Sequence, residues 1–214
     1  MIRELYKYFK LELLKLKWRL RNRHNSTNLN SICNINNVQV GIKTYGDLNI
    51  EFYDKNGSVI IGNYCSIAKK CIFLCGGEHD YKRISTWPFQ TKIYQRNKLP
   101  IHTKSKDNQS KIVVEDDVWL GYDCLILSGV TIGKGSVVGA RSIVSKDIPP
   151  YSIFAGNRII KQRFSNETIN KLKEIDFSSI THTFGDKYNK YVITHVDDSN
   201  VDEIINAFTD KNAN

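Results

Sequence analysis

The chain has 214 residues, of which 41% are hydrophobic, and its formal net charge is +9. This length allows one substantial domain with appendages, and the hydrophobic fraction is ordinary for a globular protein with a real core. No run of about 18 apolar residues occurs, and the first residues carry charges where a signal sequence has an apolar core, so we expect a cytoplasmic protein. The five cysteines lack metal-type spacing, so neither disulfides nor a metal site is expected.

Residues 1–26 are expected to form a basic amphipathic helix. Residues 1–24 contain eight Lys and Arg and two Glu, a net charge of +6, which leaves +3 for the rest and argues against nucleic acid as a partner. This helix can pack its apolar face on the protein's own body or on a neighbouring subunit, or it can contact an anionic membrane surface. The apolar residues recur every three or four positions, as one helix face requires: Ile2, Leu5, Tyr6, Phe9, Leu13, Leu16 and Leu20.

A six-residue repeat dominates the middle of the chain. From Val114 it reads VEDDVW, LGYDCL, ILSGVT, IGKGSV, VGARSI, VSKDIP, with an aliphatic first position and a small or medium-sized fifth position. Copies in the same pattern begin at Val40 (VGIKTY) and Ile61 (IGNYCS, IAKKCI). A period of six fits neither a 3.6-residue helix nor an alternating strand. It is typical of a solenoid of short strands, with the aliphatic residues on the axis and the small ones at corners.

The repeats are interrupted by residues 74–111. Ile61 and Val114 lie 53 residues apart, which is not a multiple of six, so the register is broken between them. The interruption has no repeat and many charges, and it predicts a loop that extends outward from a rigid scaffold, as functional loops often do. It contains His79 between two acids, followed by the Ser-Thr-Trp-Pro-Phe motif of residues 85–89.

These features together resemble the hexapeptide-repeat acetyltransferases, in particular the xenobiotic and polysaccharide branch related to streptogramin and type B chloramphenicol acetyltransferases. The resemblance covers about residues 58–164. Its motifs are His79 with Ser-Thr-Trp-Pro-Phe, then "DDVWLGYDCLILSGVTIGKGSVVGARSIVSKDIPPYSIFAGN", then "IKQRF". It implies a left-handed parallel β-helix with three strands per coil over residues 27–157, a homotrimer with sites between subunits, and acetyl-CoA as co-substrate without a metal.

The resemblance implies that His79 is the general base. A sugar hydroxyl has a pKa far above 7, so it attacks a thioester slowly unless a base such as histidine removes its proton as the bond forms. Transfer is then direct, without an acyl-enzyme. The family often has an acid three residues after this histidine, whereas the chain has Lys82 there. The remaining histidines are expected to be solvated or structural: His24, His102, His182 and His195.

Further site residues follow from the same resemblance. On the acceptor side, Lys82, Trp87 and Trp119 are candidates, although Trp87 and Phe89 can instead anchor the loop to the coil and Trp119 can simply pack on its exterior. Coenzyme A needs a groove for its pantetheine arm and cations for its phosphates. The candidates beside the later coils are Gly121, Gly139, Ala140, Ser145, Lys146, Arg158, Lys161 and Arg163. Corner geometry would also require the two glycines.

A C-terminal extension, residues 158–214, is expected to contain helices. Its start departs from the family, which commonly has Gly-Asn-Pro-Ala where this chain has Gly-Asn-Arg-Ile from Gly156. One helix should begin after a cap at Ser165 or Asn166 and run to about residue 175. A strand and a terminal helix capped by Ser199 or Asn200 are expected within residues 191–208.

The leading interpretation is an acetyl-CoA-dependent O-acetyltransferase that acts on a hydroxyl of a cell-surface polysaccharide or its precursor, in the cytoplasm at the inner face of the membrane. Two alternatives keep the chemistry and change the acceptor: N-acetylation of a nucleotide-linked amino sugar, and O-acetylation of an antibiotic. A third alternative is a non-enzymatic scaffold that binds membranes or polyanions through its basic helix.

Overall fold

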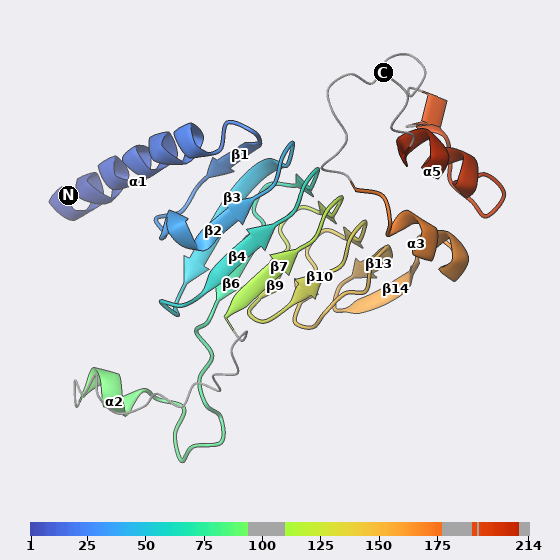
Figure 1. The fold of residues 1–214 in the computed structure, drawn as a ribbon. Coiled ribbons are helices and arrows are strands. Elements are labelled where there is room, and N and C mark those ends of the chain that lie inside the picture. Colours follow the sequence, from blue (N-terminus) through green and yellow to red (C-terminus); the bar gives the residue numbers. More distant parts are fainter. Residues whose placement is uncertain (94–109, 177–189, 192, 210–214) are drawn as a thin grey trace.

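The computed structural model describes residues 1–93, 110–176, 190, 191 and 193–209. It is mainly parallel strand, with helices before and after the strand region (Figure 1). The helices are α1 (Ile2–Arg21), α2 (Phe89–Lys92), α3 (Asn166–Leu172) and α5 (Val201–Thr209), with a 3-10 turn at Ile35–Asn37. The strands are β1 (Ser26–Leu29), β2 (Val38–Val40), β3 (Tyr45–Phe52), β4 (Ser58–Ile61), β5 (Ser66–Ile67), β6 (Ile72–Cys75), β7 (Lys111–Val114), β8 (Trp119–Leu120), β9 (Leu125–Leu127), β10 (Thr131–Ile132), β11 (Val137–Val138), β12 (Ile143–Val144), β13 (Ser152–Ala155) and β14 (Arg158–Gln162).

The strands stack in parallel, and neighbours in a stack come from successive sets of three repeats. Thr131 lies opposite Val113, Val137 opposite Trp119, and Ile143 opposite Leu125, so each pair is 18 residues apart. One sheet has the order β10-β7-β4-β2, and the other has the order β12-β9-β6-β3-β5-β8-β11-β13-β14 with β1 on β3. The expected mainly β architecture is confirmed, while the left-handed winding of the coil stays a prediction.

The repeat positions are buried as the sequence predicts. Every first-position and fifth-position side chain from Val114 to Ile148 is at most 2% exposed. Cys65 and Cys71 take the fifth position in the upstream copies and are fully buried, so their small size fits the packing. The first-position residues are Val114, Leu120, Ile126, Ile132, Val138 and Val144, and the fifth-position residues are Val118, Cys124, Val130, Ser136, Ser142 and Ile148.

The fourth repeat position has a left-handed backbone, which the sequence analysis did not predict. Its φ is positive at Lys43, Tyr64, Lys70, Asp117, Asp123 and Arg141, between 56° and 65°, and also at Gly129 and Gly135. This conformation costs a non-glycine residue roughly 1–2 kcal/mol. Glycine and aspartate adopt this backbone readily, but lysine, tyrosine and arginine do not. At Lys43, Tyr64, Lys70 and Arg141 the turn therefore forms because closing the corner requires it.

The interruption leaves the stacking intact. Ser58 lies opposite Lys111, Ser66 opposite Trp119, and Ile72 opposite Leu125. The strands before the loop therefore still pair with the strands after it, with the paired residues 53 positions apart in the sequence instead of 18. The loop is therefore an insertion between β6 and β7. From the end of β6 the chain runs outward from the body to α2 (Figure 1). Residues 94–109 of the loop, including His102, lie outside the described residues.

The C-terminal extension packs on the last strands. β14 pairs antiparallel with β13, and α3 begins at the expected cap, where the Ser165 hydroxyl accepts a hydrogen bond from the Thr168 amide at 3.1 Å. A small core joins α3 to α5 through Ile169, Leu172 and Val201. The terminal helix is confirmed, but the strand expected before it is wrong, because Lys190, Tyr191 and Ile193 are helical. His182 lies outside the described residues.

α1 joins the body through its C-terminal half. It ends at Arg21, earlier than expected, because the Asn22 amide closes the last turn on the Trp18 carbonyl and β1 begins at Ser26. Trp18 is 1% exposed and its indole N–H donates to the Thr27 hydroxyl at 3.1 Å. In the described part of the chain, no helix is long and apolar enough to cross a membrane.

Candidate active site

His79 lies on the loop and is oriented by a backbone carbonyl. Its Nδ1 is 2.5 Å from the carbonyl oxygen of Thr86. A carbonyl oxygen can only accept, so Nδ1 must carry the ring proton, and the neutral imidazole then presents Nε2 as an acceptor. The side chain is exposed. This tautomer is the one that a general base working through Nε2 requires.

The carboxylate of Asp80, next to His79, is bound to other groups of the loop. Asp80 accepts hydrogen bonds from the Lys82 backbone amide at 3.0 Å and from Arg83 Nε at 3.2 Å. These contacts lower the pKa of the Asp80 carboxyl, the amide of Lys82 being the largest cause. Asp80 therefore closes a turn over residues 80–83, and Lys82 lies exposed within it.

The aromatic motif packs on itself. The rings of Trp87 and Phe89 meet edge-on, with centroids 4.6 Å apart at 66°. Both side chains remain nearly half exposed, at 47% and 45%. Their apolar surface is covered partly by each other and partly left open, and the expectation that they anchor the loop to the coil stays a prediction.

The loop is attached to the body at its base. The Gly76 amide donates to the Ser128 hydroxyl, which in turn donates to the Leu74 carbonyl at 3.0 Å. Gly76 and Gly77 have φ of 83° and 99°, a backbone that suits glycine. Beyond this base, the hydrogen bonds found for residues 78–93, in so far as their partners are described, stay within the segment. We call residues 78–93 the arm.

Trp119 lies on the outer face of the coil. It is 55% exposed on β8 and sits between Ser66 of β5 and Val137 of β11 in the stack. Successive side chains of a strand point to opposite sides, so Trp119 points outward because its neighbour Leu120 is buried on the axis. An exposed indole on a rigid stack can offer a flat apolar surface to a ligand or to another subunit.

The two candidate glycines differ in the space around them. A Cβ on Gly121 would lie 2.6 Å from the Ala140 amide nitrogen and 2.7 Å from the Val138 carbonyl oxygen, whereas one on Gly139 would come no closer than 3.3 Å to Ala155. Both glycine amides donate within the coil, to Val138 and Phe154, at 2.8 and 2.7 Å. These amides are therefore committed to the stack, and Gly121 is required by close packing between coils.

The candidate cations fall into two groups. Arg163 is held inside the chain: its guanidinium donates to the Gly135 carbonyl at 2.5 Å, lies 3.7 Å from the Asp117 carboxylate and covers the Phe164 ring at 5.0 Å. Burial raises the pKa of Asp117, and Arg163 opposes that shift. Arg158 and Lys161 lie exposed on β14. Exposed candidates at the coil corners are Ala140, Ser145 and Lys146.

Known proteins match the repeat region and its surroundings. The family described as "Bacterial transferase hexapeptide (six repeats)" matches residues 111–146. A probable macrolide acetyltransferase from Lysinibacillus sphaericus is 32% identical over 138 residues, covering 63% of this chain and 77% of the relative. The chain belongs to the hexapeptide-repeat acetyltransferases. A solved hexapeptide-repeat-containing acetyltransferase from Vibrio cholerae shares the fold at 23% identity, covering 74% of this chain and 87% of that one with a TM-score of 0.50.

A chloramphenicol acetyltransferase from Escherichia coli is 36% identical over 129 residues and covers 57% of this chain. The match spans 60% of that relative's length. In the candidate site, the group that the sequence does not indicate is the Thr86 carbonyl. No side-chain pattern could have indicated it, because a backbone oxygen is present at every residue and only the folded arm brings this one to His79.

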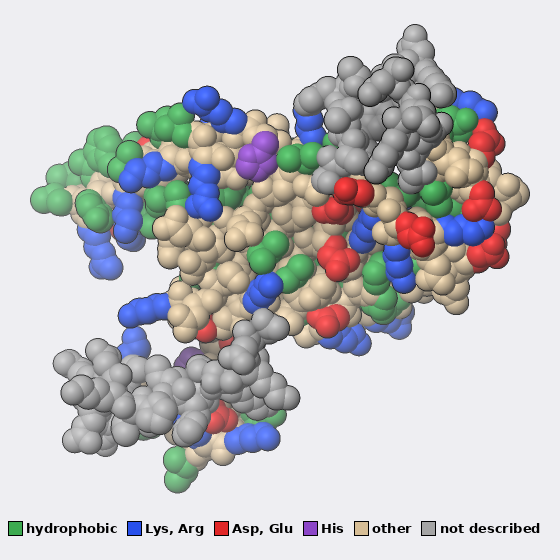
Figure 2. All heavy atoms as spheres, in the orientation of Figure 1, with side chains coloured by type: hydrophobic (Ala, Val, Ile, Leu, Met, Phe, Trp, Pro, Cys, Tyr) green, Lys and Arg blue, Asp and Glu red, His purple; other side chains and the backbone are tan. Residues whose placement is uncertain are grey.

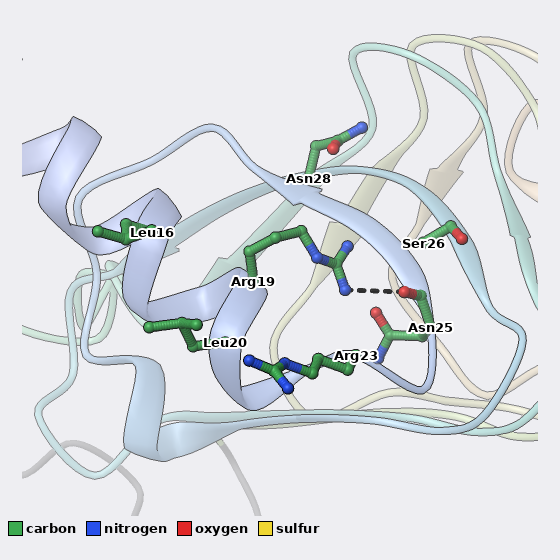
Figure 3. Close-up of a pocket in the computed structure, with 7 residues that line it drawn as sticks. All are labelled: Leu16, Arg19, Leu20, Arg23, Asn25, Ser26 and Asn28. Atoms are coloured by element: carbon green, nitrogen blue, oxygen red, sulfur yellow. Dashed lines mark hydrogen bonds between the residues drawn. The ribbon is translucent and has the colours of Figure 1, made fainter.

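A further hollow lies far along the chain from the arm, where α1 meets β1. Figure 3 shows its lining from the end of the helix and the start of the strand, including Leu16, Leu20 and Arg23. Its volume is about 490 Å³. None of the candidate catalytic or coenzyme residues lines it.

Proposed function

We propose that the protein is an acetyl-CoA-dependent O-acetyltransferase that acts on a hydroxyl of a cell-surface polysaccharide or its precursor. The observation that carries the proposal is His79 on an outward arm, with Nδ1 committed to the Thr86 carbonyl at 2.5 Å and Nε2 left to accept a proton. Membership of an acetyltransferase family supports the acetyl donor, and the resemblance of His79 and its Ser-Thr-Trp-Pro-Phe motif to that family supports the role of His79.

The chemistry follows from the tautomer. Nε2 of His79 takes the proton of the acceptor hydroxyl while its oxygen attacks the thioester carbonyl. The Nδ1–H bond to Thr86 stabilises the imidazolium that forms, because a carbonyl oxygen facing a cation makes a charge-assisted hydrogen bond. When the new C–O bond is made and the C–S bond breaks, the proton passes to the leaving thiolate. The products are an O-acetyl ester and free coenzyme A, without an acyl-enzyme.

Residues on the coil would hold the donor. Exposed Lys146, Arg158 and Lys161 supply the positive charge that the phosphates of coenzyme A require. Trp119 offers an exposed apolar face for the acceptor or the pantetheine arm. Trp87 and Lys82 would be further acceptor contacts, since both are exposed on the arm that carries His79.

The arm also supports a homotrimer. Because its aromatic pair is half exposed and the chain runs outward from the body, a neighbouring subunit can cover the arm and bring His79 to the outer face of the next coil (Figure 1). The site would then lie between two subunits. Light scattering tests this: the account expects three times the chain mass of 24.6 kDa, and a monomer in the active preparation would contradict it.

Two classes of acceptor fit this chain. A polysaccharide precursor carried on a membrane lipid fits a cytoplasmic enzyme with a basic helix at the membrane's inner face. A second candidate acceptor, the hydroxyl of an antibiotic, is favoured by the relatives named for chloramphenicol and macrolides. Both candidates use the same base and donor.

One experiment separates the acceptors. The protein is incubated with acetyl-CoA and, in parallel, with surface polysaccharide fragments, a nucleotide-linked amino sugar, chloramphenicol and a macrolide, and free thiol and product mass are followed. We expect thiol release with the polysaccharide fragments and a product that loses its acetyl group in mild alkali, as an ester does. An alkali-resistant product would indicate an amide. Thiol release with the antibiotics alone would show that the acceptor is an antibiotic and not a polysaccharide.

A further inference from the structure

α1 has two apolar faces, and among the described residues only one of them packs on the body. The inner face, with Leu14 and Trp18, packs on the core. The outer face points the other way, because its residues lie half a turn from Trp18 on the helix. We call its seven residues the stripe, and each is more than half exposed: Ile2, Leu5, Tyr6, Phe9, Leu13, Leu16 and Leu20. The expectation that this face packs on the protein's own body is therefore wrong.

The stripe is bordered by positive charge. Arg3, Lys10 and Lys17 recur every seven residues along one edge, so they share one side of the helix. Among the residues described, these three form no ion pair, while the two acids of α1 bind other lysines: Glu4 binds Lys7 and Glu12 binds Lys15. Figure 2 shows hydrophobic side chains gathered over α1 with Lys and Arg beside them.

The C-terminal end of α1 is fixed to the body, which sets the direction of the stripe. The Arg19 guanidinium donates to the carbonyls of Thr27 at 2.9 Å and Asn25 at 2.7 Å, as well as to that of Asn22. Figure 3 shows the hydrogen bond between Arg19 and Asn25 at the edge of the hollow. The N-terminal half of α1 then projects beyond the strands (Figure 1). A rigidly held helix can present the same face in every molecule.

We propose that α1 docks the protein on a membrane surface rich in anionic phospholipid, with the stripe among the acyl chains and Arg3, Lys10 and Lys17 at the phosphates. A helix with a wide apolar face and cations along its edge binds such a surface in the plane of the headgroups. Leu16 and Leu20 continue the stripe into the hollow beside Arg23, which gives one phosphate a place at the helix end (Figure 3).

The positive charge of α1 favours a membrane over a second copy of α1 as the partner that covers the stripe. Residues 1–24 carry a net charge of +6. Packing the stripe of one copy on the stripe of another would bring both sets of cations together, which is unfavourable. An anionic bilayer offers apolar depth and the opposite charge at once. This inference does not depend on the enzymatic activity proposed above.

The test is co-sedimentation of the full-length protein with phosphatidylcholine vesicles, with and without about one third phosphatidylglycerol. We expect binding to the anionic vesicles, little to the neutral ones, and a decline as salt rises. Replacing Lys10 and Lys17 by Gln should weaken binding about 25-fold, since each cation near the surface contributes about fivefold. The matched control replaces the exposed Lys55 and Lys173 by Gln and should stay within about twofold.

A second pair of variants tests the stripe. Leu13→Gln with Leu16→Gln should weaken vesicle binding more than tenfold, whereas Ile193→Gln, at an 81% exposed apolar residue elsewhere, should not. Circular dichroism checks that helix content is kept. Equal binding to neutral vesicles, or binding unchanged by both double variants, would overturn the proposal. A change in native mass on stripe substitution would overturn it too, because a second copy would then cover the stripe.

Discussion

The Nδ1 atom of His79 lies 2.5 Å from the backbone carbonyl oxygen of Thr86, seven residues further along the same arm. This contact fixes the tautomer without a carboxylate. Since the acceptor is part of the backbone, the arm can have Lys82 where the family often has an acid and still present Nε2 as a hydrogen-bond acceptor. The Ser-Thr-Trp-Pro-Phe motif acquires a second role from this contact, because it supplies the carbonyl.

Gly121 and Gly139 should respond differently to an added methyl group. Gly121→Ala places Cβ 2.6 Å from a backbone nitrogen of the next coil, so we expect a loss of about 2 kcal/mol or more in the free energy of unfolding. Gly139→Ala meets nothing closer than the Ala155 side chain at 3.3 Å and the Phe154 carbonyl oxygen at 3.4 Å, so it should change stability by less than about 1 kcal/mol. Urea unfolding of both variants measures these changes in the free energy of unfolding. Equal losses would show that Gly121 does not pack against the backbone of the next coil as closely as described above.

Lys161 and Arg163 are matched cations with different expected effects. Lys161→Gln removes an exposed charge on β14, so the KM for acetyl-CoA should rise about five- to tenfold with the melting temperature unchanged. Arg163→Gln removes the contacts to Gly135 and Asp117 and should cost about 1 kcal/mol of stability, roughly 2–4 °C in melting temperature. Steady-state kinetics and thermal melting at one protein concentration compare them. The reverse pattern would assign phosphate binding to Arg163.

Stability should fall in alkali. Burial raises the pKa of the Cys65 and Cys75 thiols from an ordinary 9.0, each to about 12. A raised pKa in the folded state contributes stability below pH 9 that is lost as the pH rises towards 12, because the unfolded chain releases these protons first. Each thiol should add a slope of about 1.4 kcal/mol per pH unit.

Cys65→Ser tests this assignment, since a serine hydroxyl keeps the hydrogen bond that the thiol gives to the Glu115 carbonyl and does not ionise in this range. Urea unfolding between pH 9 and 11 measures how the free energy of unfolding changes with pH. In the variant this dependence should be shallower by the contribution of one thiol. An unchanged slope would mean that Cys65 is not the group that titrates.

The sequence predicts the stacked strands well because each repeat carries the residue types that its packing requires. An aliphatic first position and a small fifth position leave one arrangement that buries both, as Leu120 and Cys124 show. The left-handed turns at Lys43 and Tyr64 could not be predicted this way. Their side chains do not favour that backbone, and closure of the coil imposes it.

For the candidate site, the sequence indicates the histidine but not the contacts around it. His79 and its motif are visible as an interruption of the repeat. The contact to Thr86, the edge-on pair of Trp87 and Phe89, and the commitment of Arg163 to Asp117 arise from how segments meet in space. For the basic helix, periodicity indicated the stripe, but only the folded chain shows that Trp18 occupies the opposite face.

The most direct test of the account measures acceptor-dependent release of thiol from acetyl-CoA by the wild type, by His79→Ala and by His195→Ala, an exposed histidine outside the arm. With the responding acceptor from the panel above, we expect His79→Ala to lose at least about a hundredfold in kcat, as removal of a general base does, and His195→Ala to match the wild type. Equal release by all three proteins would remove His79 from the mechanism and contradict the proposed function.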